Sequence, residues 1–144
     1  QNYGARRYDR IRRGYRLTLA IAGSIGLFAG LLFFFLDREI FGLFVTEPRA
    51  VEVGGDYLKI LALSQLFMVT ESVTAGAFNG TGRTLPPALT GILFTGARIP
   101  MAFFLTAFPA IGLNGIWWSI TLSSIFKGTV LPLWYLRFQR RLPR

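Results

Sequence analysis

The sequence predicts an all-α protein, a polytopic membrane helix bundle with four transmembrane helices. Three observations support this fold class. Apolar residues make up 52% of the chain and charged residues only 16%, which is too apolar for a small soluble domain with a richly charged surface. Residues 17–36 form an uncharged run of about 20 residues, the length that crosses a ~30 Å hydrocarbon core as a helix. Three further apolar segments follow.

The first predicted span covers residues 17–36, and residues 1–16 form a basic cytoplasmic segment before it. Arg6, Arg10 and Arg13 fall on one side of a helix, with Tyr8 and Ile11 near the other, so this segment could lie along the membrane surface. An RNA-binding arm is the alternative. Because the basic residues gather at the chain ends without interleaved aromatics, we expect the lipid bilayer as partner and no nucleic acid.

The other predicted spans cover residues 48–79, 85–108 and 111–138, within a transmembrane region of residues 17–144. The second begins at Thr46-Glu47-Pro48, where a threonine cap, an acid and a proline are typical of a helix start. Gly54-Gly55 predicts a bend in that helix. Pro100 and Pro132 predict kinks in the third and fourth spans, because neighbouring membrane helices can satisfy the freed carbonyls.

Charges outside the spans predict the orientation. The loop between the first two spans is acidic, whereas arginines gather at both chain ends: Asp37, Glu39, Glu47, Glu52 and Asp56 in the loop, and Arg6, Arg7, Arg10, Arg12, Arg13, Arg16, Arg137, Arg140, Arg141 and Arg144 at the ends. By the positive-inside rule, both termini and the loop at Arg83 are cytoplasmic. We therefore expect a multi-pass protein of the cell membrane.

Three charged residues fall deep in the predicted spans: Glu71, Arg98 and Lys127. At ~1.5 Å per residue they lie roughly 11, 18 and 15 Å below the cytoplasmic helix ends. Glu71 is either half of a structural ion pair or an ion-coupling or substrate site. Its expected charge partners are Arg98 and Lys127, and we predict that Arg98 approaches it. Lys127 could instead extend towards the inner surface.

Two pairs of glycines have the spacing that lets membrane helices approach closely, Gly26 with Gly30 and Gly76 with Gly80, so we expect them in helix contacts. The sequence contains no cysteine and no histidine, which excludes thiolate and imidazole metal sites and Cys or His catalysis. No nucleophile–base pair stands out either. We therefore expect no catalytic residue, no metal, no cofactor and no enzymatic activity.

Several short motifs occur in an order that resembles one transporter family. They are Gln1-Asn2-Tyr3-Gly4-Ala5 before a basic stretch, Glu39-Ile40-Phe41-Gly42-Leu43-Phe44, Tyr57-Leu58-Lys59-Ile60, Gly76-Ala77-Phe78-Asn79-Gly80-Thr81-Gly82-Arg83-Thr84, Arg98-Ile99-Pro100 and Gly115-Ile116-Trp117-Trp118. Together they resemble the C-terminal third of multidrug and toxic compound extrusion (MATE) transporters. Since the sequence begins at Gln1, we interpret it as an incomplete piece of a longer polypeptide.

The resemblance implies that the four spans are helices nine to twelve of a twelve-helix transporter, in the second of two six-helix lobes. Such proteins exchange cationic or amphipathic organic compounds for sodium ions or protons. Some branches carry an acid on the tenth helix, where Glu71 lies about a turn nearer the glycine-rich loop. The missing N-terminal portion and small organic substrates are the implied partners. Two alternatives stay open: a lipid-linked oligosaccharide flippase of related fold, and a structural membrane subunit without transport.

Overall fold

The computed structural model describes residues 1–143, and the regular secondary structure of that part is helical, which confirms the all-α prediction. Its helices follow one another in an antiparallel bundle: α1 (Tyr8–Phe35), α2 (Asp37–Gly42), α3 (Pro48–Ala62), α4 (Gln65–Gly80), α5 (Leu85–Gly96), α6 (Arg98–Thr106) and α7 (Asn114–Arg140).

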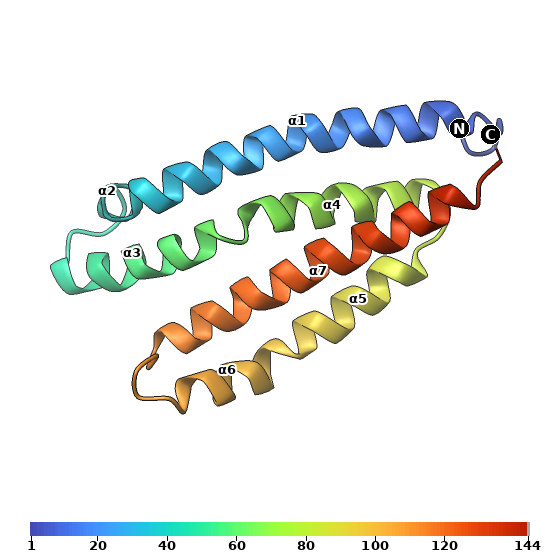
Figure 1. Cartoon of the computed structure of the whole chain (residues 1–144). Helices are drawn as coiled ribbons and strands as arrows, with labels where there is room; N and C mark the ends of the chain where they lie inside the picture. Colours follow the sequence, from blue (N-terminus) through green and yellow to red (C-terminus); the bar gives the residue numbers. More distant parts are fainter. Residues whose placement is uncertain (144) are drawn as a thin grey trace.

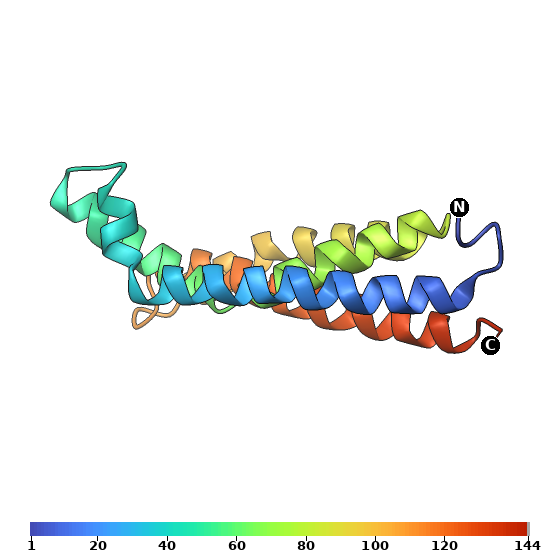
Figure 2. The same cartoon turned by 90° about the horizontal axis from the view of Figure 1, so that it is seen from above.

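The helices form four long rods, namely α1, α3 with α4, α5 with α6, and α7 (Figure 1). The rods lie side by side, and α7 runs between the α3–α4 rod and the α5–α6 rod, contacting all four of those helices. α1 packs on the other side of α3 and α4. Both termini lie at one end of the bundle, while α2 and the start of α3 lie at the other (Figure 2).

The first rod differs from the prediction at both ends. α1 begins at Tyr8 and continues without a break to Phe35, so residues 8–16 extend the first helix and do not form a separate helix along the membrane surface. Tyr15 is buried, and Arg12 donates hydrogen bonds of 3.1 and 2.8 Å to the carbonyls of Gln139 and Leu142. α2, which the sequence did not predict, then folds back onto α3.

The second rod bends at Leu63 and Ser64, not at Gly54-Gly55 as predicted; α3 and α4 meet there at 55°. The glycines serve another purpose, because a Cβ at Gly54 would collide with the ring of Phe41 on α2. At the bend, Thr121 of α7 donates a 3.0 Å hydrogen bond to the carbonyl of Ile60, and Ser64 Oγ donates one of 2.9 Å to Leu61. Carbonyls freed by the bend thus find partners inside the bundle.

The two prolines predicted to kink their spans, Pro100 and Pro132, act differently. The third rod breaks at Ala97, between α5 and α6, because Pro100 has no N–H to donate to the carbonyl of Gly96 four residues earlier. α7 in contrast stays one helix from Asn114 to Arg140 with Pro132 inside it, so the proline does not interrupt the fourth rod.

The inside of the bundle combines an aromatic cluster around Phe78 and Tyr135 with many buried hydroxyl groups, whereas the outside is apolar. Of the nine largest fully buried side chains, six are serines or threonines, while many large apolar side chains face outward, among them Ile21, Phe28, Ile92 and Phe103. Water would reverse this distribution, whereas lipid favours it, because apolar side chains match the acyl chains and polar ones seek partners inside. The chain is therefore a membrane helix bundle.

Length and apolarity support the spans to different degrees. Tyr8–Phe35 and Leu85–Thr106 can each cross a bilayer, and the bent pair α3–α4 is a third span if it crosses as one unit. α7 has 27 residues, which is about 40 Å at ~1.5 Å per residue. It is less apolar because it carries Lys127 and the buried hydroxyl residues Ser119, Thr121, Ser123 and Ser124. The neighbouring helices cover these side chains, because α7 lies at the centre of the bundle.

Candidate functional site: buried charges along α7

A glycine lets α7 lie unusually close to α4. A Cβ added at Gly128 would collide with the carbonyl oxygen of Phe67 and lie 2.6 Å from its Cβ. Only a residue without a side chain permits this approach. Because Gly128 follows Lys127 and Phe67 precedes Glu71 by one helical turn, the close contact brings those two charged residues to the same level of the bundle.

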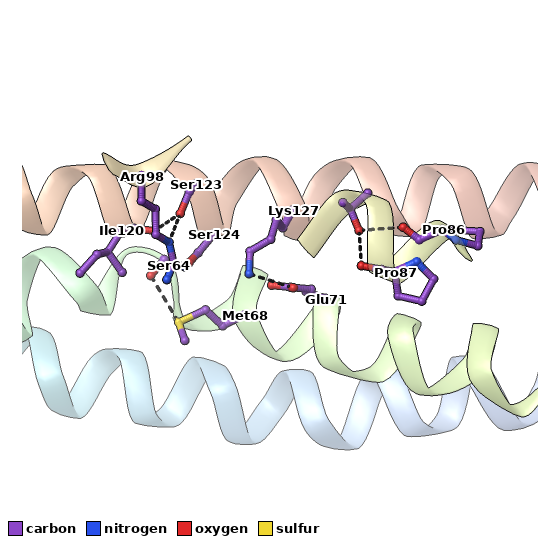
Figure 3. Close-up of polar contacts among 11 residues, drawn as sticks. Ser64, Met68, Glu71, Pro86, Pro87, Arg98, Ile120, Ser123, Ser124 and Lys127 are labelled. Atoms are coloured by element: carbon purple, nitrogen blue, oxygen red, sulfur yellow. Dashed lines mark hydrogen bonds and ion pairs between the residues drawn. The ribbon is translucent and has the colours of Figure 1, made fainter. Parts of the chain in front are cut away.

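Glu71 and Lys127 form an ion pair across the α4–α7 contact (Figure 3). Lys127 Nζ lies 3.0 Å from Glu71 Oε1, and the side chains are only 11% and 22% exposed, respectively. A partly buried carboxylate within a membrane bundle needs a partner charge. Lys127 supplies it, so its ammonium is held inside the bundle by Glu71.

Arg98, at the start of α6, bonds to hydroxyl groups of α7 instead of to Glu71. Its Nε donates a 2.6 Å hydrogen bond to Ser123 Oγ, and its Nη2 donates one of 3.2 Å to Ser124 Oγ. The predicted pairing of Arg98 with Glu71 is therefore wrong. Figure 3 shows the two groups at different levels along α7, with Arg98 beside the serines and Glu71 beside Lys127.

The order of the helices explains this outcome. α7 lies between α4, which carries Glu71, and α6, which carries Arg98. Any side chain from α6 that points into the bundle meets α7 first. The depth of a residue along the membrane normal gives its level in the bundle but not its neighbours. The similar depths of Arg98 and Glu71 were therefore not enough to predict a contact between them.

The two glycine pairs take different positions. Gly26 and Gly30 lie where α1 contacts the α3–α4 rod, since an added Cβ would meet Val69 Cγ2 at 2.8 Å or the carbonyl of Ala62 at 3.2 Å. An added Cβ at Gly76 or Gly80 meets nothing within 4 Å. The helix packing predicted at Gly76 and Gly80 is therefore not found within residues 1–143. Both glycines instead border an open groove of about 640 Å³ between α1 and α4.

Comparison with known families decides the identity. The sequence profile of the MatE family matches residues 1–104. The chain belongs to the MatE family. The resemblance to MATE transporters that the motifs predicted is thereby confirmed.

Individual relatives agree with the MatE assignment. The chain is 32% identical over 127 residues to a probable multidrug resistance protein NorM of Thermotoga maritima, covering 88% of this chain and 26% of that protein. It is 25% identical to the probable multidrug resistance protein YoeA of Bacillus subtilis, covering 81% and 26%. An uncharacterized transporter of Schizosaccharomyces pombe is 31% identical, covering 85% and 23%. The chain thus spans about a quarter of the length of these relatives.

The hydroxyl residues on α7 of this MatE chain were not predicted as site residues from the sequence. A signal was present, because Ser119, Ser123 and Lys127 recur at intervals of four and therefore share one helical face. A lysine on a face of small polar residues predicts a buried polar stripe. The stripe also contains Thr121 and Ser124, and in the structure it contacts both Arg98 and the bend of the α3–α4 rod.

Proposed function

We propose that this chain forms helices nine to twelve of a MATE efflux transporter, which exchanges cationic or amphipathic organic compounds for sodium ions or protons. The observation that carries the proposal is the set of buried hydroxyl and charged groups inside a bundle with an apolar exterior, in a member of the MatE family. Polar groups placed inside membrane helices are expensive and commonly line the paths of ions and substrates. Two relatives are named probable multidrug resistance proteins, which points to organic compounds as substrates.

Transport by the complete protein tests this proposal. Purified protein in proteoliposomes should move a cationic dye when a sodium or a proton gradient is imposed. Vesicles without protein, and loaded vesicles whose gradient has been collapsed by an ionophore, serve as controls. Correctly inserted protein that moves no cationic or amphipathic compound under either gradient would argue for a structural subunit.

Within the proposed transporter, we assign Glu71 a structural role. Lys127 already compensates the charge of Glu71 at 3.0 Å, so no ion from solution is needed at this site. An ion-coupling acid would instead have to exchange its partner for a sodium ion or proton during each cycle. Glu71→Gln should therefore lower the abundance of the complete transporter, while the molecules that do fold keep their efflux rate. Normal abundance with lost efflux would make Glu71 a coupling residue.

We also propose that both termini face the cytoplasm of a cell membrane. The acidic residues of α2 and α3 lie at the end opposite the termini and the arginines of α7, and cytoplasmic segments carry the excess of arginine. The chain contains no cysteine, so single cysteines introduced into it can report this topology once any cysteine in the rest of the protein has been replaced. Glu52→Cys should react with an impermeant maleimide in intact cells, and Arg140→Cys only after permeabilisation. The opposite pattern would reverse the orientation.

A further inference from the structure

Three arginines border a second groove, which lies beside the C-terminal half of α7 at the end of the bundle that holds both termini. The groove has a volume of about 620 Å³. Its lining combines basic and apolar side chains: Arg83, Arg137 and Arg141 with Val130, Leu133, Trp134, Phe138 and Leu142. Neither the ion pair of Glu71 nor the hydroxyl stripe lines it.

The fold fixes one arginine in place. Arg83 follows Gly82, whose φ of +75° lies in the left-handed region, and the N–H of Arg83 bonds to the carbonyl of Phe78 at 3.0 Å while that of Gly82 bonds to Asn79 at 2.9 Å. This pair of bonds is the Schellman motif that ends many helices. It directs the guanidinium of Arg83 over the ring of Phe138, 4.4 Å from the centroid, where a cation–π contact holds it.

The charge of the groove is uncompensated. No carboxylate lines it, and among residues 1–143 the one ion pair joins Lys127 to Glu71, so all three guanidinium groups lack an acidic partner in the described part of the chain. Arg137 and Arg141 are four residues apart and so lie above one another along the helix axis. Three guanidinium groups around one hollow provide donors in the fork geometry that matches phosphate oxygens.

The apolar part of the groove points to a lipid. Val130, Leu133 and Trp134 continue along α7 from Arg137 towards the middle of the bundle, over roughly 10 Å at ~1.5 Å per residue. All three are between 37% and 54% exposed. A free phosphate would use only the arginines, whereas a phospholipid would place its headgroup among them and an acyl chain along these apolar residues.

We propose that this groove binds an anionic phospholipid, with its phosphate held by Arg83, Arg137 and Arg141 and its acyl chain along Trp134. Trp134 is 40% exposed and can report the occupant directly. The complete protein is reconstituted with brominated phosphatidylglycerol or brominated phosphatidylcholine, which quench nearby tryptophan. The signal of Trp134 is the fluorescence that Trp134→Phe removes. Phosphatidylglycerol should bind at least about fivefold more tightly, since one basic residue near an anionic surface contributes about that factor.

Two matched triple variants separate the groove from general surface charge. Arg83→Gln/Arg137→Gln/Arg141→Gln should lose the preference for phosphatidylglycerol. Arg10→Gln/Arg13→Gln/Arg140→Gln removes the same charge from exposed positions near the same end that do not line the groove, and it should keep the preference. If the first triple variant does not fold, Arg141→Gln, just beyond the end of α7, should still lower the preference.

Three results would overturn the proposal. Equal quenching by both lipids in the unmodified protein would leave no anionic preference. An equal loss in both triple variants would assign the preference to overall charge. Displacement of brominated phosphatidylglycerol by millimolar inorganic phosphate would make a soluble phosphate, and not a lipid, the ligand.

Discussion

Replacing Gly128 with alanine is expected to destabilise the bundle more than any other single methyl group added along α7. The new Cβ would collide with the backbone of Phe67, lying 2.7 Å from its carbonyl carbon, and a helix backbone cannot rotate away as a side chain can. Overpacking of this kind costs about 1–3 kcal/mol, and we expect the upper end of that range. Unfolding of the purified protein in mixed micelles by increasing dodecyl sulfate measures the loss.

Gly91→Ala is the matched control for this substitution. Gly91 lies within α5, and an added Cβ there meets nothing within 4 Å. Alanine in place of a helical glycine should stabilise by up to about 1 kcal/mol, so the two variants should move the unfolding midpoint in opposite directions. Equal midpoints would mean that α4 and α7 do not touch at Gly128.

The second large effect is expected at the ion pair. Glu71→Gln or Lys127→Gln alone should each destabilise by on the order of 3 kcal/mol, because each leaves an uncompensated charge inside the bundle. The double variant Glu71→Gln/Lys127→Gln should recover most of that loss, since it leaves two neutral groups that can hydrogen-bond. The same dodecyl sulfate titration on all four proteins gives the coupling free energy of the pair.

Glu39→Gln controls for the loss of a carboxylate as such, because Glu39 is exposed on α2, and its effect should be near zero. Additive losses in the double variant would show that the two residues act independently. In that case the 3.0 Å contact contributes nothing to stability, and the structural assignment of Glu71 in the proposed transporter would fail with it.

The sequence predicted the fold class and the approximate rods because both depend on local composition. Apolar runs and the number of residues needed to cross a bilayer act over a single helix. The exact positions at which the rods bend or break were harder to predict from the sequence. At the bend near Leu63-Ser64, a hydroxyl from α7, that of Thr121, bonds to a carbonyl of α3. Gly54 packs against Phe41 of α2, a helix that the sequence pattern did not predict. Such details are decided by neighbours distant in sequence.

The charged residues illustrate the same division. Burial of Glu71, Arg98 and Lys127 followed from their positions within apolar runs, and their need for partners followed from the cost of charge in lipid. Predicting which basic residue pairs with Glu71 would have required the order in which the helices lie side by side. That order depends on close contacts such as Gly128 with Phe67 and Gly115 with Leu105, which side-chain size makes possible but spacing alone does not specify.

The central position of α7 has a consequence for the order in which the protein is made. Glu71, Arg98 and the carbonyl of Ile60 all find their partners on α7, which leaves the ribosome after the helices that carry them. Until it inserts, a carboxylate, a guanidinium and a freed carbonyl of the earlier helices lack these partners. The earlier rods therefore form an intermediate with unpaired polar groups, and insertion of α7 is the step that supplies their partners.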